Sequence, residues 1–298
     1  MQATNPIFIY RHCLGFAMFT LAASFLNEQI EDSREINEKY GGRIDSLFGI
    51  STDIPFDGGR EFFNVPQIST QDLIGFVHRC NDSGLGFNFV LNTTLVENKD
   101  FENKAFLNLL ESCHSRKNGV ILANDSLHGF IKQNFPKFTR RASRIYNPLT
   151  EKSILGLCSE FDVVVLPEQL NDKREFIRRL PAEKIELLAN SFCFKGCGKI
   201  PKHYDLISGM NRRAIEGEDP GELCLSHLQG LGLCDSHTME SIDNVRIEPE
   251  QIQQYLDLGI RHFKILDRMN PPTKSLAERY VSYASGAPVK SLPVVQHL

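Results

Sequence analysis

Residues 87–123 read FNFVLNTTLVENKDFENKAFLNLLESCHSRKNGVILA and contain the unit from which the rest of the chain is built. Both ends of this stretch, Phe87 to Asn92 and Gly119 to Ala123, are short and largely apolar, as expected for strands buried on both faces. Between them, Phe101 to Cys113 carries apolar side chains at helical spacing. A strand, a helix and a second strand in this order predict two parallel neighbours in one sheet.

The same unit recurs along the chain. The predicted strands are Met18 to Ala22, Arg43 to Gly49, Phe87 to Asn92, Gly119 to Ala123, Arg141 to Tyr146, Asp162 to Leu166, Lys184 to Asn190 and His262 to Leu266. Helices are predicted from Asn27 to a stop at Gly41-Gly42, and over Thr70 to Cys80, Phe101 to Cys113, Leu127 to Phe135 and Pro249 to Gly259.

Eight strands that alternate with helices predict an α/β protein and specifically a (β/α)₈ TIM-type barrel. An open doubly wound sheet would need fewer strands or a second domain. We therefore expect a single barrel domain over residues 14–285, with an N-terminal extension at 1–13 and a C-terminal tail at 286–298.

Composition limits the functional classes. The chain has 298 residues, of which 41% are hydrophobic and 23% charged, and its formal net charge is -4. This acidic balance makes nucleic acid an unexpected partner, although one that is not excluded. The basic pairs Arg140-Arg141 and Arg212-Arg213 are predicted to lie on solvated faces.

One apolar segment has two interpretations. Leu14 to Leu26 follows Arg11, as the hydrophobic part of a signal peptide would, but it is too short to span a bilayer. Because the barrel needs its first strand here, we interpret Met18 to Ala22 as a buried strand. We expect a cytoplasmic protein without a membrane span.

The chain has eight cysteines, too few for the disulfide framework of a small secreted domain. Four are scattered singly and are predicted to be buried apolar residues: Cys13, Cys80, Cys113 and Cys158. The other four lie close together in the sequence and are predicted to bind one metal centre: Cys193, Cys197, Cys224 and Cys234.

Two centres fit this group of cysteines. Zinc would use closely spaced thiolate pairs, as at Cys193 and Cys197, and histidine is available at His203, His227 and His237. The wider spacing of Cys224 and Cys234 favours an iron–sulfur cluster, with zinc as the alternative. All four cysteines lie in a long insertion between the seventh and eighth strands, on the side of the barrel where chemistry is expected.

Several segments resemble the collagenase-like peptidase family U-thirty-two, and in particular its short ubiquinone-biosynthesis members UbiU and UbiV. The matching segments, in order, are Gly58-Gly59-Arg60, Leu91-Asn92, Asn190 to Tyr204, and Arg246 to Glu250 followed by Phe263-Lys264-Ile265. This resemblance covers most of the chain and implies a 4Fe-4S cluster. The chain departs from the family at Leu266, where the family strand has glutamate, and after the sixth strand, where Glu168 and Asn171-Asp172 only loosely match an Arg-Glu pair.

The resemblance further implies an enzyme, or a subunit of one. We expect an oxygen-independent hydroxylase that acts on a small aromatic compound, a quinone precursor or an RNA base, with prephenate as the oxygen donor. On this hypothesis Arg60, Arg144 and Arg268 are candidates to bind donor carboxylates. Asn92 and Asn190, at strand ends, and Glu168 complete the candidate substrate site; the alternative role of both asparagines is to bond loop backbone.

Two other functions stay open. The chain could be a non-catalytic, cluster-binding partner of a second subunit from the same family. It could also be a peptidase, as the family name suggests, but the sequence has no Gly-x-Ser-x-Gly or His-Glu-x-x-His motif. No catalytic residue is predicted from the sequence.

Overall fold

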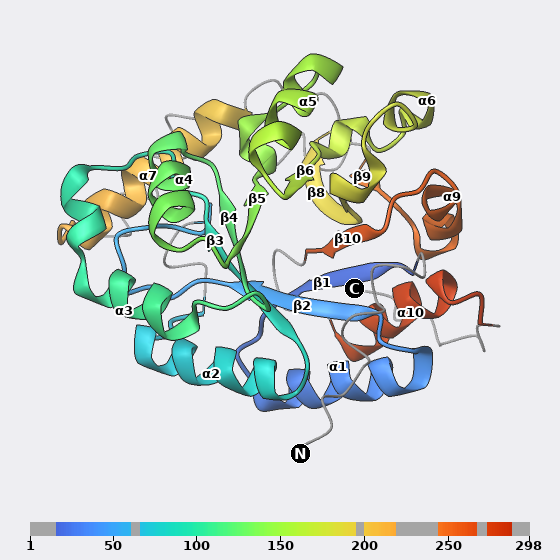
Figure 1. Cartoon of the computed structure of the whole chain (residues 1–298), viewed down its shortest axis with the longest axis horizontal. Coiled ribbons are helices and arrows are strands. Elements are labelled where there is room, and N and C mark those ends of the chain that lie inside the picture. The colour runs from blue at the N-terminus through green and yellow to red at the C-terminus, as the bar shows by residue number, and fades with distance from the viewer. Residues whose placement is uncertain (1–15, 61–65, 195–199, 219–243, 267–272, 288–298) are drawn as a thin grey trace.

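The computed structural model describes residues 16–60, 66–194, 200–218, 244–266 and 273–287. Eight parallel strands form a closed barrel in the order β1-β10-β7-β6-β5-β4-β3-β2 (Figure 1). Their bounds are β1 Met18–Ala22, β2 Ile44–Gly49, β3 Gly86–Leu91, β4 Gly119–Leu122, β5 Thr139–Ala142, β6 Val163–Val165, β7 Ile185–Leu188 and β10 His262–Ile265. The predicted (β/α)₈ TIM-type barrel is confirmed.

Helices surround the barrel on the outside, as Figure 1 shows. They are α1 Asn27–Tyr40, α2 Thr70–Asp82, α3 Lys104–Cys113, α4 Asp125–Asn134, α5 Glu151–Glu160, α6 Arg174–Ile177, α9 Ile252–Leu256 and α10 Lys274–Ala284. Sequence signals explain several ends. The side chains of Ser69, Asn103 and Asn124 cap α2, α3 and α4, and Gly41 ends α1 with a φ of 80°.

The described residues of the insertion between β7 and β10 include strand β8 (Asn190–Phe194), helix α7 (Ile200–Ile215), strand β9 (Asn244–Arg246) and the 3₁₀ helix η8 (Pro249–Gln251) before α9. β8 and β9 pair antiparallel in a small second sheet that was not predicted. Asn190 therefore begins β8, and the seventh barrel strand ends at Leu188. The predicted N-terminal extension, residues 1–13, lies outside the described residues. So does the predicted C-terminal tail, residues 286–298, apart from its first two residues.

The interpretation of the first strand is confirmed. Met18–Ala22 is β1, and it pairs with both β2 and β10 at the point where the barrel closes. Within the described ranges, no helix is long and apolar enough to cross a membrane.

The fifth strand is shorter than predicted. β5 ends at Ala142, and Arg144–Tyr146 forms a 3₁₀ turn, η4, in place of the predicted continuation. The Ser143 hydroxyl accepts a hydrogen bond from the Ile145 amide, and Asn147 adopts a left-handed backbone with a φ of 48°. Local side-chain bonding to the backbone therefore ends the strand before the predicted Tyr146.

Phenylalanine dominates the layer between barrel and helices. Fully buried members include Phe19, Phe76, Phe87, Phe89, Phe106, Phe138 and Phe263. Phe19 of β1 stacks on Phe263 of β10 with 5.6 Å between ring centroids. Burial of each such ring stabilises the fold by about 1.5–3 kcal/mol. Three of the scattered cysteines, Cys80, Cys113 and Cys158, lie buried and free on the inner sides of helices, as predicted.

Candidate functional site

A row of polar side chains crosses the inside of the barrel. Thr20 Oγ1 and Ser46 Oγ lie 3.1 Å apart, Asn88 donates to Ser46 Oγ at 2.8 Å, and Arg141 Nε donates to Asn88 Oδ1 at 3.1 Å. The Arg141 guanidinium also pairs with Glu186 at 2.6 Å. These side chains come from β1, β2, β3, β5 and β7, so the interior links the strands through hydrogen bonds as well as through packing.

Arg141 was predicted to lie on a solvated face, and this was wrong. Its side chain is 7% exposed and that of Glu186 is 1% exposed. Arg141 is at an inward position of β5, whereas the neighbouring Arg140 faces out and pairs with Asp162. Because side chains alternate along a strand, two consecutive arginines necessarily face opposite sides of the barrel wall.

Lys264 of β10 joins this interior group. It is 5% exposed, and its Nζ lies 3.9 Å from the centroid of the Phe48 ring. Burial lowers its pKa to about 8; Glu186 acts in the opposite direction, and three guanidinium groups lower the pKa further. These are the guanidinium groups of Arg141, Arg60 and Arg144. Several positive charges therefore act on the buried Lys264.

An apolar layer lies towards the carboxyl ends of the strands. Its members are Ala22, Phe48, Val90 and Ile121, with Leu266 packed against them. Leu266, where the sequence departs from the U-thirty-two resemblance, therefore packs against this layer.

Arg144 and Glu168 were predicted separately as candidate site residues, and the structure brings them together. They form a buried ion pair in which the Arg144 side chain is 9% exposed and the Glu168 side chain 2%. Arg144 Nη2 also donates a hydrogen bond to the Tyr204 hydroxyl at 2.8 Å. The Arg144 guanidinium carbon lies 5.5 Å from the centroid of the Tyr204 ring. Arg144 follows β5, Glu168 follows β6 and Tyr204 belongs to α7, so three segments meet at the carboxyl end of the barrel.

The loop containing Gly58-Gly59-Arg60 lies under α7. Gly59 has a φ of 76°, and a Cβ there would lie 2.8 Å from the Tyr204 ring. Asn211 of α7 donates a hydrogen bond to the Arg60 carbonyl at 2.7 Å. Glycine is therefore required both by the backbone conformation and by the approach of Tyr204.

Asn92 forms hydrogen bonds with the backbone of the loop that contains Asp57 and Gly58. Its amide N–H donates to the Asp57 carbonyl at 2.8 Å, and its side-chain Nδ2 lies 3.4 Å from the Gly58 carbonyl. The buried Oδ1 atom of Asn92 has no hydrogen-bond partner among the described residues. The Asn92 side chain thus bonds loop backbone through Nδ2, which was the alternative to its predicted substrate-binding role. Its Oδ1 atom could still accept a hydrogen bond.

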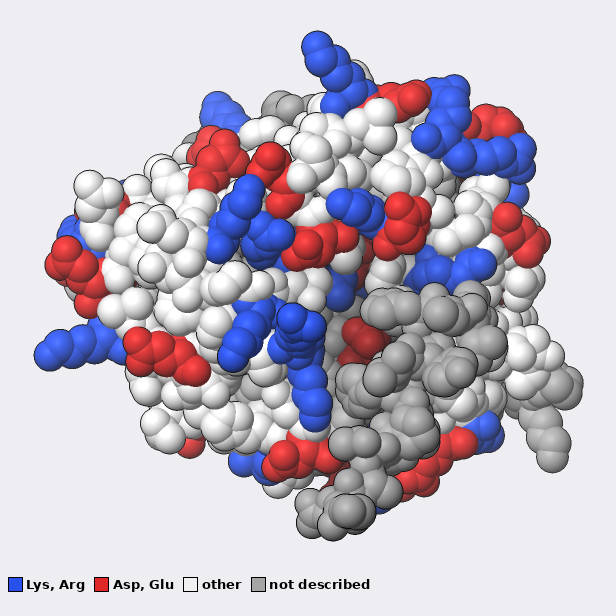
Figure 2. Space-filling view, viewed as in Figure 1, with Lys and Arg blue, Asp and Glu red and all other residues white. Residues whose placement is uncertain are grey.

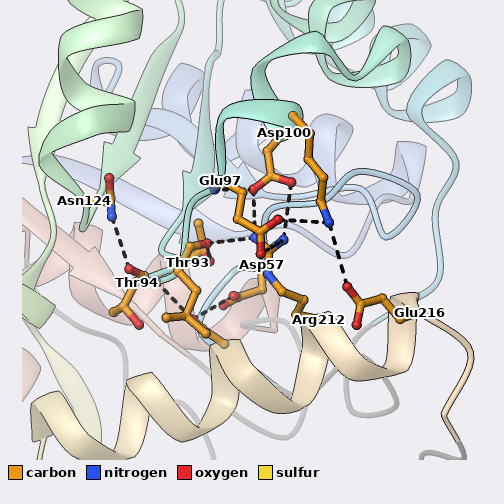
Figure 3. Close-up of polar contacts among 11 residues, drawn as sticks. Asp57, Thr93, Thr94, Glu97, Asp100, Asn124, Arg212 and Glu216 are labelled. Carbon is orange, nitrogen blue, oxygen red and sulfur yellow. Dashed lines mark hydrogen bonds and ion pairs between the residues drawn. The ribbon is translucent and has the colours of Figure 1, made fainter.

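Polar contacts fasten α7 to the loops after β2 and β3 (Figure 3). Ser208 donates to Asp57 at 2.9 Å and accepts from the Thr94 amide at 3.0 Å. One turn further along α7, Arg212 pairs with Asp100 at 2.7 Å and with Glu97 at 3.3 Å. An apolar contact of α7 with Ile145 and Ala123 extends the attachment to the segments after β5 and β4.

Asp57 is the buried carboxyl group of this attachment. Burial raises its pKa, while hydrogen bonds from Gly59, Ser208 and Thr93 lower it, as does the more distant charge of Arg212. The carboxylate oxygens of Asp57 therefore accept hydrogen bonds from Ser208 of α7 and from Gly59 of its own loop.

Asn190 also has a structural role. Its side-chain oxygen accepts a hydrogen bond from the Leu266 amide, and its backbone pairs with Arg246 in the small sheet. Asn190 thereby joins β8 to the end of β10.

The predicted metal ligands are only partly within the described residues. Cys193 is in β8, which starts two residues after β7 ends, so its backbone lies on the carboxyl side of the barrel. Cys197, Cys224, Cys234 and the candidate Arg268 lie outside the described residues. Within the described part of the chain, no group of three or more His, Cys, Asp or Glu side chains could hold a metal ion.

A surface cavity of about 380 Å³ lies beside the small sheet, outside the barrel. It is lined by Asn171, Asp172, Arg174, Glu175, Arg246, Gln251 and Tyr255. The cavity includes Arg246 and Asn171-Asp172, which were noted in the sequence. Basic and acidic side chains are intermixed over the face shown in Figure 2.

Comparisons with known proteins support the fold. No protein-family model matches the chain, and no curated protein matches it. Among solved structures, the U32 peptidase Mk0906 superposes with a TM-score of 0.55 at 13% sequence identity, covering 86% of this chain and 94% of that one. The chain has the fold of a U32 peptidase. The narrower resemblance to UbiU and UbiV stays a prediction.

Sequence reasoning missed four residues: Arg141, Glu186 and Lys264 of the barrel interior, and Tyr204 at the mouth. A signal for three of them is present, because a charged residue within a short apolar strand must face either solvent or a polar barrel interior. Tyr204 has no such signal, since only the path of α7 brings it to Arg144.

Proposed function

We propose that this chain is an iron–sulfur protein of the reducing cytoplasm that takes part in oxygen-independent hydroxylation of a small aromatic compound, a quinone precursor or an RNA base. It works alone or with a second chain of the same family. Its carboxyl-end barrel mouth binds a carboxylate-bearing oxygen donor of the prephenate type.

The observation that carries this proposal is a cluster of positive charge. Four cationic groups, those of Arg60, Arg141, Arg144 and Lys264, interact within the barrel and its mouth. Two members of this cluster are paired with carboxylates, Arg141 with Glu186 and Arg144 with Glu168. Asp57 is a third buried carboxyl group nearby, and it accepts hydrogen bonds from Gly59, Ser208 and Thr93.

Buried charges are stable only when they are paired. A ligand with one or two carboxylates would be attracted to this cluster and would be bound in the bidentate manner that arginine favours. Arg144 is oriented for this role by Glu168 and Tyr204, and Arg60 is held by its loop under α7.

The proposed cluster would be held by Cys193, Cys197, Cys224 and Cys234. Four thiolates are the usual ligand set of a 4Fe-4S cluster, which supplies one-electron transfer when bound. Zinc is the alternative occupant of the same thiolates.

Anaerobic purification followed by iron and sulfide analysis tests the cofactor. We expect about four irons and four sulfides per chain, with broad visible absorption. Cys193→Ser should lose this absorption, whereas the matched variant Cys113→Ser should keep it because Cys113 is a buried, free thiol on α3. One equivalent of zinc without visible absorption would overturn the proposal.

Calorimetric titration with prephenate tests the donor site. Arg60→Glu should weaken binding at least about tenfold, since a charge-assisted contact contributes about 1.5–3 kcal/mol. The control is Arg178→Glu, because Arg178 pairs with Glu175 on the exposed surface of the barrel. Unchanged affinity in Arg60→Glu would remove the mouth from donor binding.

A peptidase is the second candidate, and the likeness to a solved U32 peptidase favours it. Incubation with a quenched fluorescent gelatin distinguishes the two functions. Our proposal expects no cleavage by the cluster-loaded protein. Cleavage that is lost in Glu168→Gln and retained in the surface variant Glu175→Gln would establish the peptidase instead.

A further inference from the structure

Lys264 has a different environment from the surface lysines of this chain. It lies inside the barrel on β10, is 5% exposed, and contacts the face of Phe48 through its Nζ at 3.9 Å. Within the described residues, Nζ forms no hydrogen bond and no ion pair, whereas Lys132 pairs with Glu160 and Lys99 with Glu97. A buried ammonium group with only an aromatic face for a partner is unfavourable.

Glu186, the carboxylate that stabilises the charge of Lys264 electrostatically, is not a direct partner of this ammonium group. Glu186 favours the protonated form of Lys264, but its Oε2 already pairs with Arg141 at 2.6 Å. The guanidinium groups of Arg141, Arg60 and Arg144 all disfavour a further positive charge. Desolvation and neighbouring cations are the two means by which proteins convert lysine into a nucleophile.

The strand neighbours add no other ionisable partner. β1 presents the hydroxyl of Thr20 beside Lys264, and β7 presents Leu188. The apolar layer of Ala22, Val90 and Leu266 lies next to Phe48. The amine is therefore bordered by this apolar layer, while the guanidinium groups of Arg141, Arg60 and Arg144 act on it electrostatically.

We infer that Lys264 is a nucleophile that forms a Schiff base with a carbonyl compound bearing a carboxylate, of the 2-oxo acid class. This inference rests on the proposed anion site, because Arg60 and Arg144 would bind the carboxylate while Nζ reaches the carbonyl carbon. The inference goes beyond that site by assigning it covalent chemistry.

The reaction balances without an oxidant or reductant. The Nζ lone pair attacks the carbonyl carbon, and a carbon–nitrogen bond forms while the carbonyl π electrons move to oxygen. Loss of that oxygen as water, with the two protons of the neutral amine, leaves the imine. The neutral amine is accessible, because a pKa of about 8 leaves roughly a tenth of Lys264 unprotonated at pH 7.

Reductive trapping on the full-length, cluster-loaded protein tests the inference. The protein is incubated with pyruvate or phenylpyruvate and sodium cyanoborohydride, digested, and mapped by mass spectrometry. We expect one dominant adduct, on the peptide that contains Lys264, formed at least about tenfold faster than adducts on Lys132 and Lys152. Its rate should rise with a midpoint near pH 8.

Two comparisons separate the parts of the inference. Acetone, which lacks a carboxylate, should label Lys264 at least about tenfold more slowly than pyruvate does. Lys264→Arg keeps the charge and should remove the adduct. Labelling spread over surface lysines with Lys264 unmodified, or equal labelling of Lys264 by acetone, would overturn the inference.

Failure of the Schiff base is distinguishable from failure of the proposed function. Binding of pyruvate and prephenate is measured separately by calorimetry without reductant. Binding without trapping at Lys264 would contradict the Schiff base and leave the anion site intact. Absence of both binding and trapping would contradict the anion site itself.

Discussion

The hydroxyl oxygen of Tyr204 accepts a hydrogen bond from Arg144 at 2.8 Å, and this bond connects α7 of the insertion to the segment that follows β5. Arg144 is at the same time paired with Glu168. The insertion that carries the predicted cysteines therefore also sets the position of a charged group at the barrel mouth.

Tyr204→Phe should destabilise the protein by about 1.5–3 kcal/mol, because a buried guanidinium loses an acceptor. It should also weaken prephenate binding, since Arg144 is no longer oriented. Urea denaturation and calorimetry measure the two effects. The control is Tyr40→Phe, which removes a hydroxyl bond to Glu278 between α1 and α10 and should leave ligand affinity unchanged.

Glu186→Leu should cost about 3–5 kcal/mol of the free energy of unfolding, because Arg141 is left buried without its partner. The double variant Arg141→Met/Glu186→Leu should be more stable than Glu186→Leu alone. Urea denaturation of the full double-mutant cycle provides the coupling energy. Additive losses would show that the two side chains are not coupled.

Gly59→Ala should destabilise the protein more than Gly41→Ala. Both glycines have a φ near +80°, but a Cβ at Gly59 meets the Tyr204 ring at 2.8 Å, whereas a Cβ at Gly41 meets nothing within 4 Å. The backbone term is about 1–2 kcal/mol for each variant, and displacement of Tyr204 adds about 1–3 kcal/mol in Gly59→Ala. Equal thermal stabilities of the two variants would contradict the contact.

Two neighbouring arginines on α7 should behave differently. Arg212→Ala leaves Asp100, whose side chain is 3% exposed, without its cation and should cost about 1.5–3 kcal/mol. Arg213→Ala removes an exposed pair with Glu218 and should have little measurable effect. Urea denaturation compares them, and an equal loss in both would argue against the attachment of α7 through Asp100.

Asp57→Asn should change the pH dependence of stability. Burial raises the pKa of Asp57 above its usual 3.8, so between these two values the folded state binds more protons than the unfolded state. The contribution of Asp57 to stability is therefore greatest below about pH 4 and falls as pH rises through the folded pKa. The stability of the wild type relative to Asp57→Asn, measured in urea from about pH 3.5 to 7, should fall with pH; a rise would contradict the sign.

Much of the fold was predictable from local patterns. Met18–Ala22 and the starts of α2 and β4 agree with the prediction, because apolar runs, helix-capping residues and glycine stops act over a few neighbouring residues. The end of β5 was not predicted, since bonding of the Ser143 side chain and the left-handed backbone of Asn147 produce a turn there. The β8–β9 sheet escaped prediction because its two strands are far apart in sequence.

The sequence by itself determined the order of the barrel elements and the presence of arginines, a glutamate and glycines in segments that end at one side of the barrel. The tertiary structure alone decided which of these groups meet. Arg144 joins Glu168 and Tyr204, and Arg141 joins Glu186 across the interior. The physical reason is that strand alternation turns a side chain inward or outward, while barrel closure and the path of α7 bring distant inward-facing charges to within hydrogen-bond distance.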